Sequence, residues 1–349
     1  MSKQMPVLGI IGGGQLGLML CEAAKKIKIK TVILSDEKNA PAQNSCDKFI
    51  YSKYNDFDTV KKFSDLVDLV TFEFENIPFK VLNKIAKSKK VLPNPKINQI
   101  VQNRKTEKSF INNIGIKTTP WALVKSKEDI KKNKDLLPGI LKTCTLGYDG
   151  KGQHVIRDIK DVKDDWRFSD EYILEKKVDL KKEISVIVTR FSNGDCSIYE
   201  PIENFHEEQI LRNSKIPANI NKKIYIQSHN DAKIIAQELN YIGTMCVEYF
   251  INEKDELLVN EIAPRVHNSG HLTINAFNVS QFENHIRAIC NLDKIDLNKN
   301  SNAEMKNIIG SDIKKYRLKS FKINEFFFDY LKKQIKDKRK MGHLTILQD

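Results

Sequence analysis

Cysteine is scarce in this sequence, and no run of apolar residues is long enough to span a membrane. The six cysteines are scattered and form no C-x-x-C pair: Cys21, Cys46, Cys144, Cys196, Cys246 and Cys290. This spacing argues against a zinc site and against a disulfide framework, and it fits a reducing compartment. A secretory signal pattern is also missing, so we expect a cytoplasmic protein with no membrane partner.

A concentrated basic block is missing too, although 58 Lys and Arg against 45 Asp and Glu give a formal net charge of +13. Such an excess can attract nucleotides or nucleic acid, or it can reflect a Lys-rich composition spread over solvated faces. Because no tight basic cluster with interleaved aromatics occurs, we favour solvated faces and expect no nucleic-acid partner. The sequence shows no internal repeat, and its 349 residues predict two or three domains.

The stretch LKTCTLGYDGKGQ, residues 141–153, is the most distinctive pattern that is present. A strand is predicted over Gly139–Thr143, followed by a glycine-dense loop and a second strand over Gln153–Arg157. No Gly-Lys-Ser/Thr and no following helix occur, which excludes a Walker-type loop. Glycines let backbone N–H groups approach an anion closely, and Lys142 would add a positive charge. An ordinary glycine-rich hairpin remains an equal alternative.

The N-terminal segment resembles a dinucleotide-binding unit. A buried strand over Val7–Ile11 precedes GGGQLG (Gly12–Gly17), and a helix over Leu18–Lys28 and a strand over Thr31–Leu34 follow, before Asp36. This is the G-x-G-x-x-G fingerprint with a later acidic residue. Any tight strand-to-helix turn over a ligand also selects glycines, so Gln15 could meet a phosphate or ribose without a nicotinamide cofactor.

Acidic residues follow the next predicted strand, Asp68–Phe72. Glu73 and Glu75, in TFEFENIP, fall at the strand end where open α/β sheets bind ligands, although surface charge explains them equally well. Further along the chain we expect helices over Ile97–Asn113, Lys127–Leu136, Asn230–Leu239 and Phe282–Ile289. Strands are expected over Tyr172–Glu175, Leu180–Arg190, Thr244–Ile251 and Leu257–Glu261. The stretch ENFHEEQILRNS, which holds His206, is predicted to be a helix-free crossover.

Two glutamates lie within apolar strands, Glu248 in VEYF and Glu261 in LLVNEI. The predicted strands place the two carboxylates in register and on one face. Burying an unpaired acid is costly, so a metal role is favoured over a pair of surface acids. Hard oxygen ligands of this kind suit magnesium that bridges nucleotide phosphates.

The motifs GGGQLG, TFEFENIP, GYDGKGQ, EISVIV, ILRNS, NEIAPRVHNSGH and RKMGH together resemble the ATP-grasp superfamily, and within it the N5-carboxyaminoimidazole ribonucleotide synthase family. The resemblance covers essentially the whole chain. It implies an α/β protein of ATP-grasp architecture. A Rossmann-like βα domain would span residues 1–100, a small β-rich lid domain 101–178, and a larger α+β domain 179–349. The implied reaction converts 5-aminoimidazole ribonucleotide, bicarbonate and ATP into the N5-carbamate, ADP and phosphate, in a homodimer that uses magnesium.

The resemblance also implies nucleotide contacts. Arg104 and Lys142 would contact ATP phosphates, under the loop Gly147, Tyr148, Asp149, Gly150, Lys151, Gly152 and Gln153. Backbone groups of Glu175, Lys176, Lys177 and Val178 would hold adenine. Glu183 would bind the ribose, with His206 near the nucleotide and Asn260 beside the phosphates. Glu248 and Glu261 would ligate magnesium.

The same resemblance implies a ribonucleotide site. Gln15 and Leu16, with Glu73 as a further candidate, would meet the substrate from the first domain. Tyr148, Asp149, Arg265, Asn268 and Ser269 would surround the reacting centre. Lys142 and Arg265 would neutralise the transferring phosphoryl group, and Asp149 would orient or deprotonate the amine. Lys332 and Arg339 would clamp the ribonucleotide phosphate.

One departure from the family pattern concerns this clamp. The family carries a Pro-Gly turn before Arg-Lys-Met/Val-Gly-His, whereas Asp337 and Lys338 stand here before Arg339. The geometry of that turn is therefore open. Three other functions are also considered: another ATP-grasp ligase, a nicotinamide-dependent oxidoreductase and a nucleic-acid binder. The second leaves the glycine hairpin and the glutamate pair unexplained.

Overall fold

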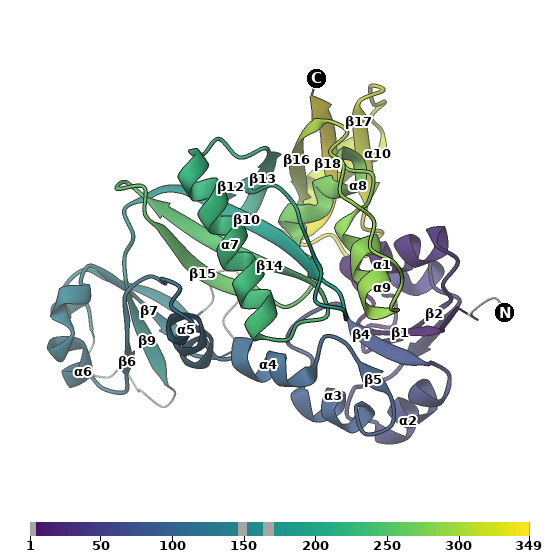
Figure 1. The fold of residues 1–349 in the computed structure, drawn as a ribbon, viewed down its shortest axis with the longest axis horizontal. Helices are drawn as coiled ribbons and strands as arrows, with labels where there is room; N and C mark the ends of the chain where they lie inside the picture. Colours follow the sequence, from purple (N-terminus) through teal and green to yellow (C-terminus); the bar gives the residue numbers. More distant parts are fainter. Residues whose placement is uncertain (1–4, 146–151, 163–170, 349) are drawn as a thin grey trace.

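A computed structural model describes residues 5–145, 152–162 and 171–348, and these residues form three sheets with helices packed around them. Figure 1 shows the small sheet set apart at one end of the molecule and the first sheet at the other, with the largest sheet between them. The α/β fold class is confirmed. No helix in the described part of the chain is long and apolar enough to cross a membrane.

The first sheet is parallel, with strand order β3-β2-β1-β4-β5. Its strands are β1 (Leu8–Ile11), β2 (Thr31–Ser35), β3 (Lys48–Tyr51), β4 (Leu69–Phe72) and β5 (Lys90–Val91). The helices are α1 (Gln15–Lys26), α2 (Phe57–Asp65) and α3 (Phe79–Ile85), with the short 3-10 helix η1 (Pro41–Asn44). Strands β1, β2 and β4 are buried throughout, as expected for a parallel sheet covered on both faces.

Helices α4 (Pro95–Val101) and α5 (Arg104–Asn113) lead out of the first sheet. The sequence predicted one helix over Ile97–Asn113, and this was wrong. Asn103 has an extended backbone and its side chain accepts hydrogen bonds from the N–H groups of Lys105 and Thr106. This is an N-cap, which starts a second helix.

The small sheet is antiparallel, with order β6-β9-β7-β8. It contains β6 (Trp121–Val124), β7 (Gly139–Thr143), β8 (Gln153–Ile156) and β9 (Tyr172–Lys176). Beside it lie α6 (Lys127–Lys132), η2 (Lys134–Leu136) and η3 (Ile159–Asp161). The predicted pairing of the strands on either side of the glycine loop is confirmed, since Lys142 of β7 is in register with Gln153 of β8.

The largest sheet follows the order β15-β14-β10-β12-β13-β16-β18-β17, with β11 paired to β10. Its strands are β10 (Leu180–Arg190), β11 (Cys196–Ile198), β12 (Ile202–Glu207), β13 (Ile210–Ile216), β14 (Gly243–Asn252), β15 (Leu257–Ala263), β16 (Asn302–Ile309), β17 (Glu325–Asp329) and β18 (Lys340–Gln348). Around it lie α7 (Lys222–Glu238), η4 (Asn268–Leu272), α8 (Thr273–Ala276), α9 (Gln281–Ile289), η5 (Gly310–Asp312) and α10 (Ile313–Arg317). Helix α7 runs across β10 and β14 in Figure 1.

Two predictions for this region were wrong. The expected crossover that holds His206 is the antiparallel hairpin β12–β13, and Glu208 and Gln209 turn it with positive φ angles of 49° and 65°. The helix predicted to start at Asn230 starts at Lys222, where the side chain of Asn221 accepts a hydrogen bond from the N–H of Ile224.

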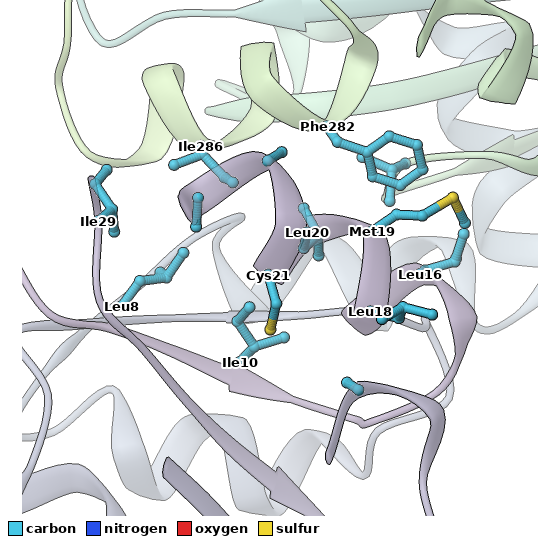
Figure 2. Close-up of a cluster of buried hydrophobic side chains, with 14 of the residues drawn as sticks. Leu8, Ile10, Leu16, Leu18, Met19, Leu20, Cys21, Ile29, Phe282 and Ile286 are labelled. Carbon is cyan, nitrogen blue, oxygen red and sulfur yellow. The ribbon is translucent and has the colours of Figure 1, made fainter. Parts of the chain in front are cut away.

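A shared hydrophobic core joins the first sheet to the C-terminal half of the chain. Figure 2 shows Phe282 and Ile286 of α9 pointing toward α1, where they meet Met19 and Leu20. All four side chains are at most 2% exposed. Packing of α1 against α9 therefore fixes the position of the N-terminal glycine turn relative to the largest sheet.

Candidate active site

A cavity of about 830 Å³ lies where the three sheets meet. Its lining includes most of the side chains that the sequence singled out: Gln15, Leu16, Arg104, Lys142, Gln153, Glu175, Lys176, Val178, Glu183, His206, Glu248, Asn260, Glu261, Arg265, Asn268, Lys332 and Arg339. Residues separated by more than 300 positions thus face one space. Carboxylates and cations both line it, so it can hold a ligand that carries phosphate together with a metal ion.

Several predicted residues do not line this cavity. Ser269 is fully buried, Lys177 is exposed to solvent, and Gly152 lies over Thr143 at the start of β8. Gly147, Tyr148, Asp149, Gly150 and Lys151 lie outside the described residues. The expected roles of these five therefore stay predictions.

Glu73 serves the glycine turn and does not reach the cavity. Its carboxylate accepts hydrogen bonds from the N–H groups of Gly14, at 2.5 Å, and Gly17, at 2.7 Å. It is 7% exposed. Those N–H groups open helix α1 and are the ones a dinucleotide phosphate would need. An internal carboxylate thus holds the N–H groups of this turn, and the expected ribonucleotide contact of Glu73 stays a prediction.

Glu75, two residues later, does line the cavity and pairs with Arg265. The guanidinium donates to both carboxylate oxygens, through Nε and through Nη2 at 3.0 Å. The backbone oxygen of Glu75 accepts from the amides of Asn98, at 3.1 Å, and Gln102, at 2.5 Å. Burial alone would raise the pKa of Glu75, but Arg265 holds it below its usual range. This fork-to-carboxylate pair fixes the direction of Arg265 from the first domain.

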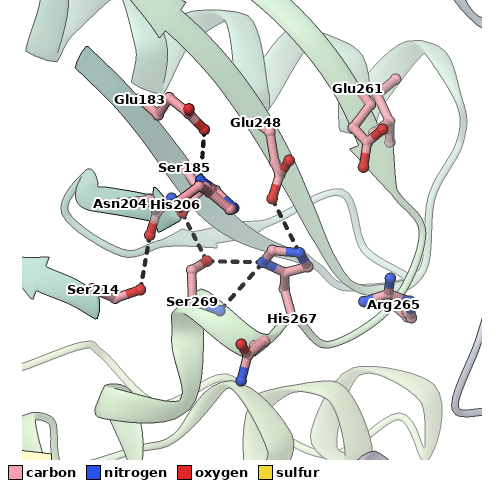
Figure 3. A network of polar contacts seen from close by, with 12 residues as sticks. Glu183, Ser185, Asn204, His206, Ser214, Glu248, Glu261, Arg265, His267 and Ser269 are labelled. Carbon is pink, nitrogen blue, oxygen red and sulfur yellow. Dashed lines mark hydrogen bonds and ion pairs between the residues drawn. The ribbon is translucent and has the colours of Figure 1, made fainter. Parts of the chain in front are cut away.

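The paired glutamates are where the sequence placed them. Glu248 of β14 is directly opposite Glu261 of β15, so the predicted register is confirmed. Burial and the nearby charge of Glu261 raise the pKa of Glu248 to about 7. Arg104 lies 3.4 Å from Glu261. Nε2 of His267 lies 3.1 Å from Glu248 (Figure 3). Two repelling carboxylates that face one cavity fit a divalent cation, which would favour the charged form of both.

A buried ion cluster supports Lys142. Glu175 lies 2.9 Å from the ammonium of Lys142 and 3.3 Å from that of Lys108, and all three side chains are at most 7% exposed. Burial would raise the pKa of Glu175, but Lys108 and Lys142 lower it to about 2. Glu175 was expected to act through its backbone. Its side chain also orients Lys142 toward the cavity, and Lys108 was not anticipated from the sequence.

His206 and Glu183 form a second pair at the cavity wall. Nδ1 of His206 lies 2.7 Å from Oε2 of Glu183, and both side chains are about a quarter exposed (Figure 3). Burial would lower the pKa of His206, but the hydrogen bond and charge of Glu183 raise it. The strand β12, and not a loop, positions this histidine.

The C-terminal cations reach the cavity despite the missing Pro-Gly turn. Lys338 stands where the family has glycine, and it adopts a φ of 63°. Left-handed backbone costs a non-glycine residue about 1–2 kcal/mol. Lys332 and Arg339 line the same space, and Lys338 joins them. Burial and the charge of Arg339 lower the pKa of Lys332 to about 8.

Comparisons with known proteins account for this arrangement. Family models match three consecutive parts of the chain: a ribonucleotide synthetase preATP-grasp domain over residues 5–102, an ATP-grasp domain over 109–282, and a phosphoribosylaminoimidazole carboxylase C-terminal domain over 303–349. The N5-carboxyaminoimidazole ribonucleotide synthase of Bacillus subtilis is 39% identical over 363 aligned positions, covering 100% of this chain and 94% of that protein. The chain belongs to the N5-carboxyaminoimidazole ribonucleotide synthase family.

Solved structures of the family agree with this assignment. A synthetase in complex with ADP matches with a TM-score of 0.92 and 39% identity, over 99% of this chain and 93% of that one. The enzyme of Aspergillus clavatus, solved with ADP and 5-aminoimidazole ribonucleotide, matches with a TM-score of 0.89 and 27% identity, over 99% and 94%. The predicted ATP-grasp architecture and the predicted ligase class of this synthase family member are confirmed.

Proposed function

We propose that this chain carboxylates 5-aminoimidazole ribonucleotide with bicarbonate at the expense of ATP, giving the N5-carbamate, ADP and phosphate. The observation that carries the proposal is that one cavity joins the carboxylate pair Glu248 and Glu261 with the cations Lys332 and Arg339. The carboxylates suit a magnesium-bound triphosphate, and the cations suit a second phosphate on the acceptor. A ligase whose acceptor lacks phosphate has no use for that second cationic group.

The nucleotide lies between the small sheet and the largest sheet. Lys142, held by Glu175, contacts a phosphate of ATP together with Arg104, which lies beside Glu261. Glu183, oriented by His206, accepts hydrogen bonds from the ribose hydroxyls. Magnesium, when bound by Glu248 and Glu261, supplies charge neutralisation at the transferring phosphoryl group. The side chains thereby fix the γ-phosphate before any transfer.

The reaction has two steps. A bicarbonate oxygen attacks the γ-phosphorus, the bond to the bridging oxygen of ADP breaks, and carboxyphosphate forms. The exocyclic amine then attacks the carboxyl carbon, the carbon–oxygen bond to phosphate breaks, and the proton lost by the amine passes to the departing phosphate. Arg265 lies within reach of both steps because Glu75 holds its guanidinium at the cavity wall, where it stabilises the charge on the phosphoryl oxygens. Asp149 is assigned to orient the amine.

The test is ADP release by the purified chain with magnesium and ATP. We expect release that needs both 5-aminoimidazole ribonucleotide and bicarbonate, with transfer of label from ¹³C-bicarbonate to the N5-carbamate. Omission of each substrate in turn provides the control. ADP release that is unaffected by the ribonucleotide, or a product without the label, would show that the acceptor is a different molecule.

The family resemblance also implies a homodimer in the cytoplasm, and we include this in the proposal. Light scattering of the purified chain at micromolar concentration measures its mass. A monomer mass of 40.2 kDa across the working concentration range would contradict the dimer.

A further inference from the structure

A thiol lies directly behind one of the proposed magnesium ligands. Cys246 and Glu248 are two residues apart on β14, so their side chains share one face of the sheet. His267 follows β15, and its ring points toward Glu248. Figure 3 shows this ring between Glu248 and Ser269. The sulfur of Cys246, a carboxylate oxygen of Glu248 and a ring nitrogen of His267 all lie within 4.8 Å of one another.

The spacing of these three atoms suits a small cation. Three atoms so placed leave a point within about 2.8 Å of each, and Zn²⁺ bonds to sulfur, nitrogen and oxygen are about 2.0–2.3 Å long. Only small side-chain movements separate this arrangement from a coordinated ion. A thiolate, an imidazole and a carboxylate select zinc or cobalt, whereas magnesium prefers oxygen ligands alone.

The surroundings of His267 match those of a metal-binding imidazole. Its Nδ1 lies 2.8 Å from the hydroxyl of Ser269, and that hydroxyl lies 2.8 Å from the hydroxyl of Ser185. Nδ1 of His267 also accepts, at 3.4 Å, from the N–H of Ser269. In the tautomer with the proton on Nδ1, the Ser269 oxygen accepts a hydrogen bond from Nδ1 while it donates to Ser185, and the lone pair of Nε2 is available to a cation beside Glu248. Metal-bound histidines usually have their second nitrogen held in this way.

We propose that Cys246, Glu248 and His267 form a second metal site for zinc-like cations, which overlaps the magnesium position because both use Glu248. Binding of Zn²⁺ displaces the thiol proton to solvent and leaves one coordination position for water. Glu248 is then withdrawn from magnesium, so a zinc-like cation inhibits the enzyme. The inhibitory part of this inference rests on the proposed function, whereas the binding part does not.

Cobalt tests binding without any reliance on activity. Co²⁺ is titrated into the full chain without nucleotide, and the sulfur-to-cobalt charge-transfer absorption is recorded. We expect saturation at one equivalent in the wild type and in Cys290→Ala, which removes a different buried thiol, and no such band in Cys246→Ala or Cys246→Ser. Loss of the Cys246 ligand should weaken Zn²⁺ binding at least about 10–100-fold, because removal of a residue that only hydrogen-bonds to a metal ligand already lowers metal affinity by that factor. Circular dichroism and the melting temperature establish that both Cys246 variants fold.

Zinc inhibition of ADP release tests the overlap. Cys246 does not line the cavity, so Cys246→Ala should keep its magnesium-supported turnover. We expect Zn²⁺ to inhibit the wild type, and excess Mg²⁺ to relieve that inhibition. The Cys246→Ala variant should resist inhibition by Zn²⁺. Absence of the cobalt band in the wild type, or a band that persists in both Cys246 variants, would overturn the site. Equal zinc inhibition of wild type and Cys246→Ala would overturn the overlap. A cobalt band in a chain that releases no ADP with 5-aminoimidazole ribonucleotide and bicarbonate supports the site and counts against the proposed function alone.

Discussion

We predict that Lys332 makes the affinity of this chain for the ribonucleotide dependent on pH. Its side chain is 8% exposed, its ammonium donates to the backbone oxygen of Lys340 at 2.8 Å, and Arg339 is close by. Burial and the repulsion of Arg339 lower the pKa of Lys332 from 10.5 to about 8. At about 1.36 kcal/mol per pKa unit, charging this lysine costs roughly 3 kcal/mol more than in water. A phosphate dianion beside Lys332 would stabilise the charged ammonium and offset much of this free-energy cost.

The sign of the effect follows from this shift. A lysine with a lowered pKa is charged below pH 8 and loses its proton as pH rises through 8, whereas the ligand phosphate stays dianionic above about pH 6. If only the charged form binds, kcat/KM for the ribonucleotide falls about tenfold for each pH unit above 8. Between pH 7 and pH 9.5 this amounts to roughly 30-fold.

The assay is ADP release at saturating ATP and bicarbonate, with the ribonucleotide varied at each pH. Lys332→Arg provides the matched variant, because a guanidinium keeps its charge over this range. We expect the fall above pH 8 in the wild type and a much flatter profile in Lys332→Arg. A profile that is flat in the wild type, or the same fall in both proteins, would refute the assignment of Lys332 to the ribonucleotide phosphate.

Three further predictions concern other parts of the molecule. Glu248→Gln and Glu261→Gln should each abolish ADP release while circular dichroism stays unchanged, since a near-isosteric amide lacks the charge that magnesium needs; turnover near wild type would remove the metal assignment. His285 is buried with a pKa of about 3, because burial disfavours its charged form and its Nδ1 accepts from the N–H of Thr244, so stability should fall as pH drops below about 6.5. At pH 5 the wild type should have lost about 2 kcal/mol of unfolding free energy through His285. Urea unfolding should therefore show a loss between pH 7 and pH 5 that is smaller by about 2 kcal/mol in His285→Gln than in the wild type. His154→Gln, which changes an exposed histidine, is the control and should behave as the wild type does. NAD and NADP should show no binding in calorimetry, because Glu73 takes the N–H groups of the glycine turn; micromolar affinity for either would contradict this.

The parts of the site that the sequence predicted are those with a local pattern. Alternation of apolar residues placed Glu248 and Glu261 on one face of two strands, and their register is confirmed. The small sheet followed from the strands beside the glycine loop. In both cases the burial of one strand face requires a particular register, so local information was sufficient.

The parts that the sequence could not predict depend on contacts between distant segments. Glu73 and Glu75 share one motif, yet their side chains have different partners. Glu73 accepts a hydrogen bond from the N–H of Gly17 in the glycine turn, and Glu75 pairs with Arg265, 190 positions away. Lys108 looks like one more solvated lysine of a charged helix, yet it is 1% exposed beside Glu175. The hairpin β12–β13 was missed because ENFHEEQILRNS is polar and carries no glycine or Asn-Gly turn signal.

The contact between Glu73 and the N-terminal glycines has a consequence for how this sequence can change. A side chain at Gly14 would place its first carbon 2.6 Å from a carboxylate oxygen of Glu73, and one at Gly12 would meet the same side chain at 2.3 Å. Shortening or removing Glu73 would make room there, but it would strip the N–H groups of Gly14 and Gly17 of their acceptor. These positions, about 60 residues apart, therefore constrain one another as a unit. A substitution at Gly14 should be tolerated only together with a change at Glu73, whereas Gly12 is also required by its φ of 100°. The glycine at position 14 thus reflects an internal partner instead of a class of cofactor.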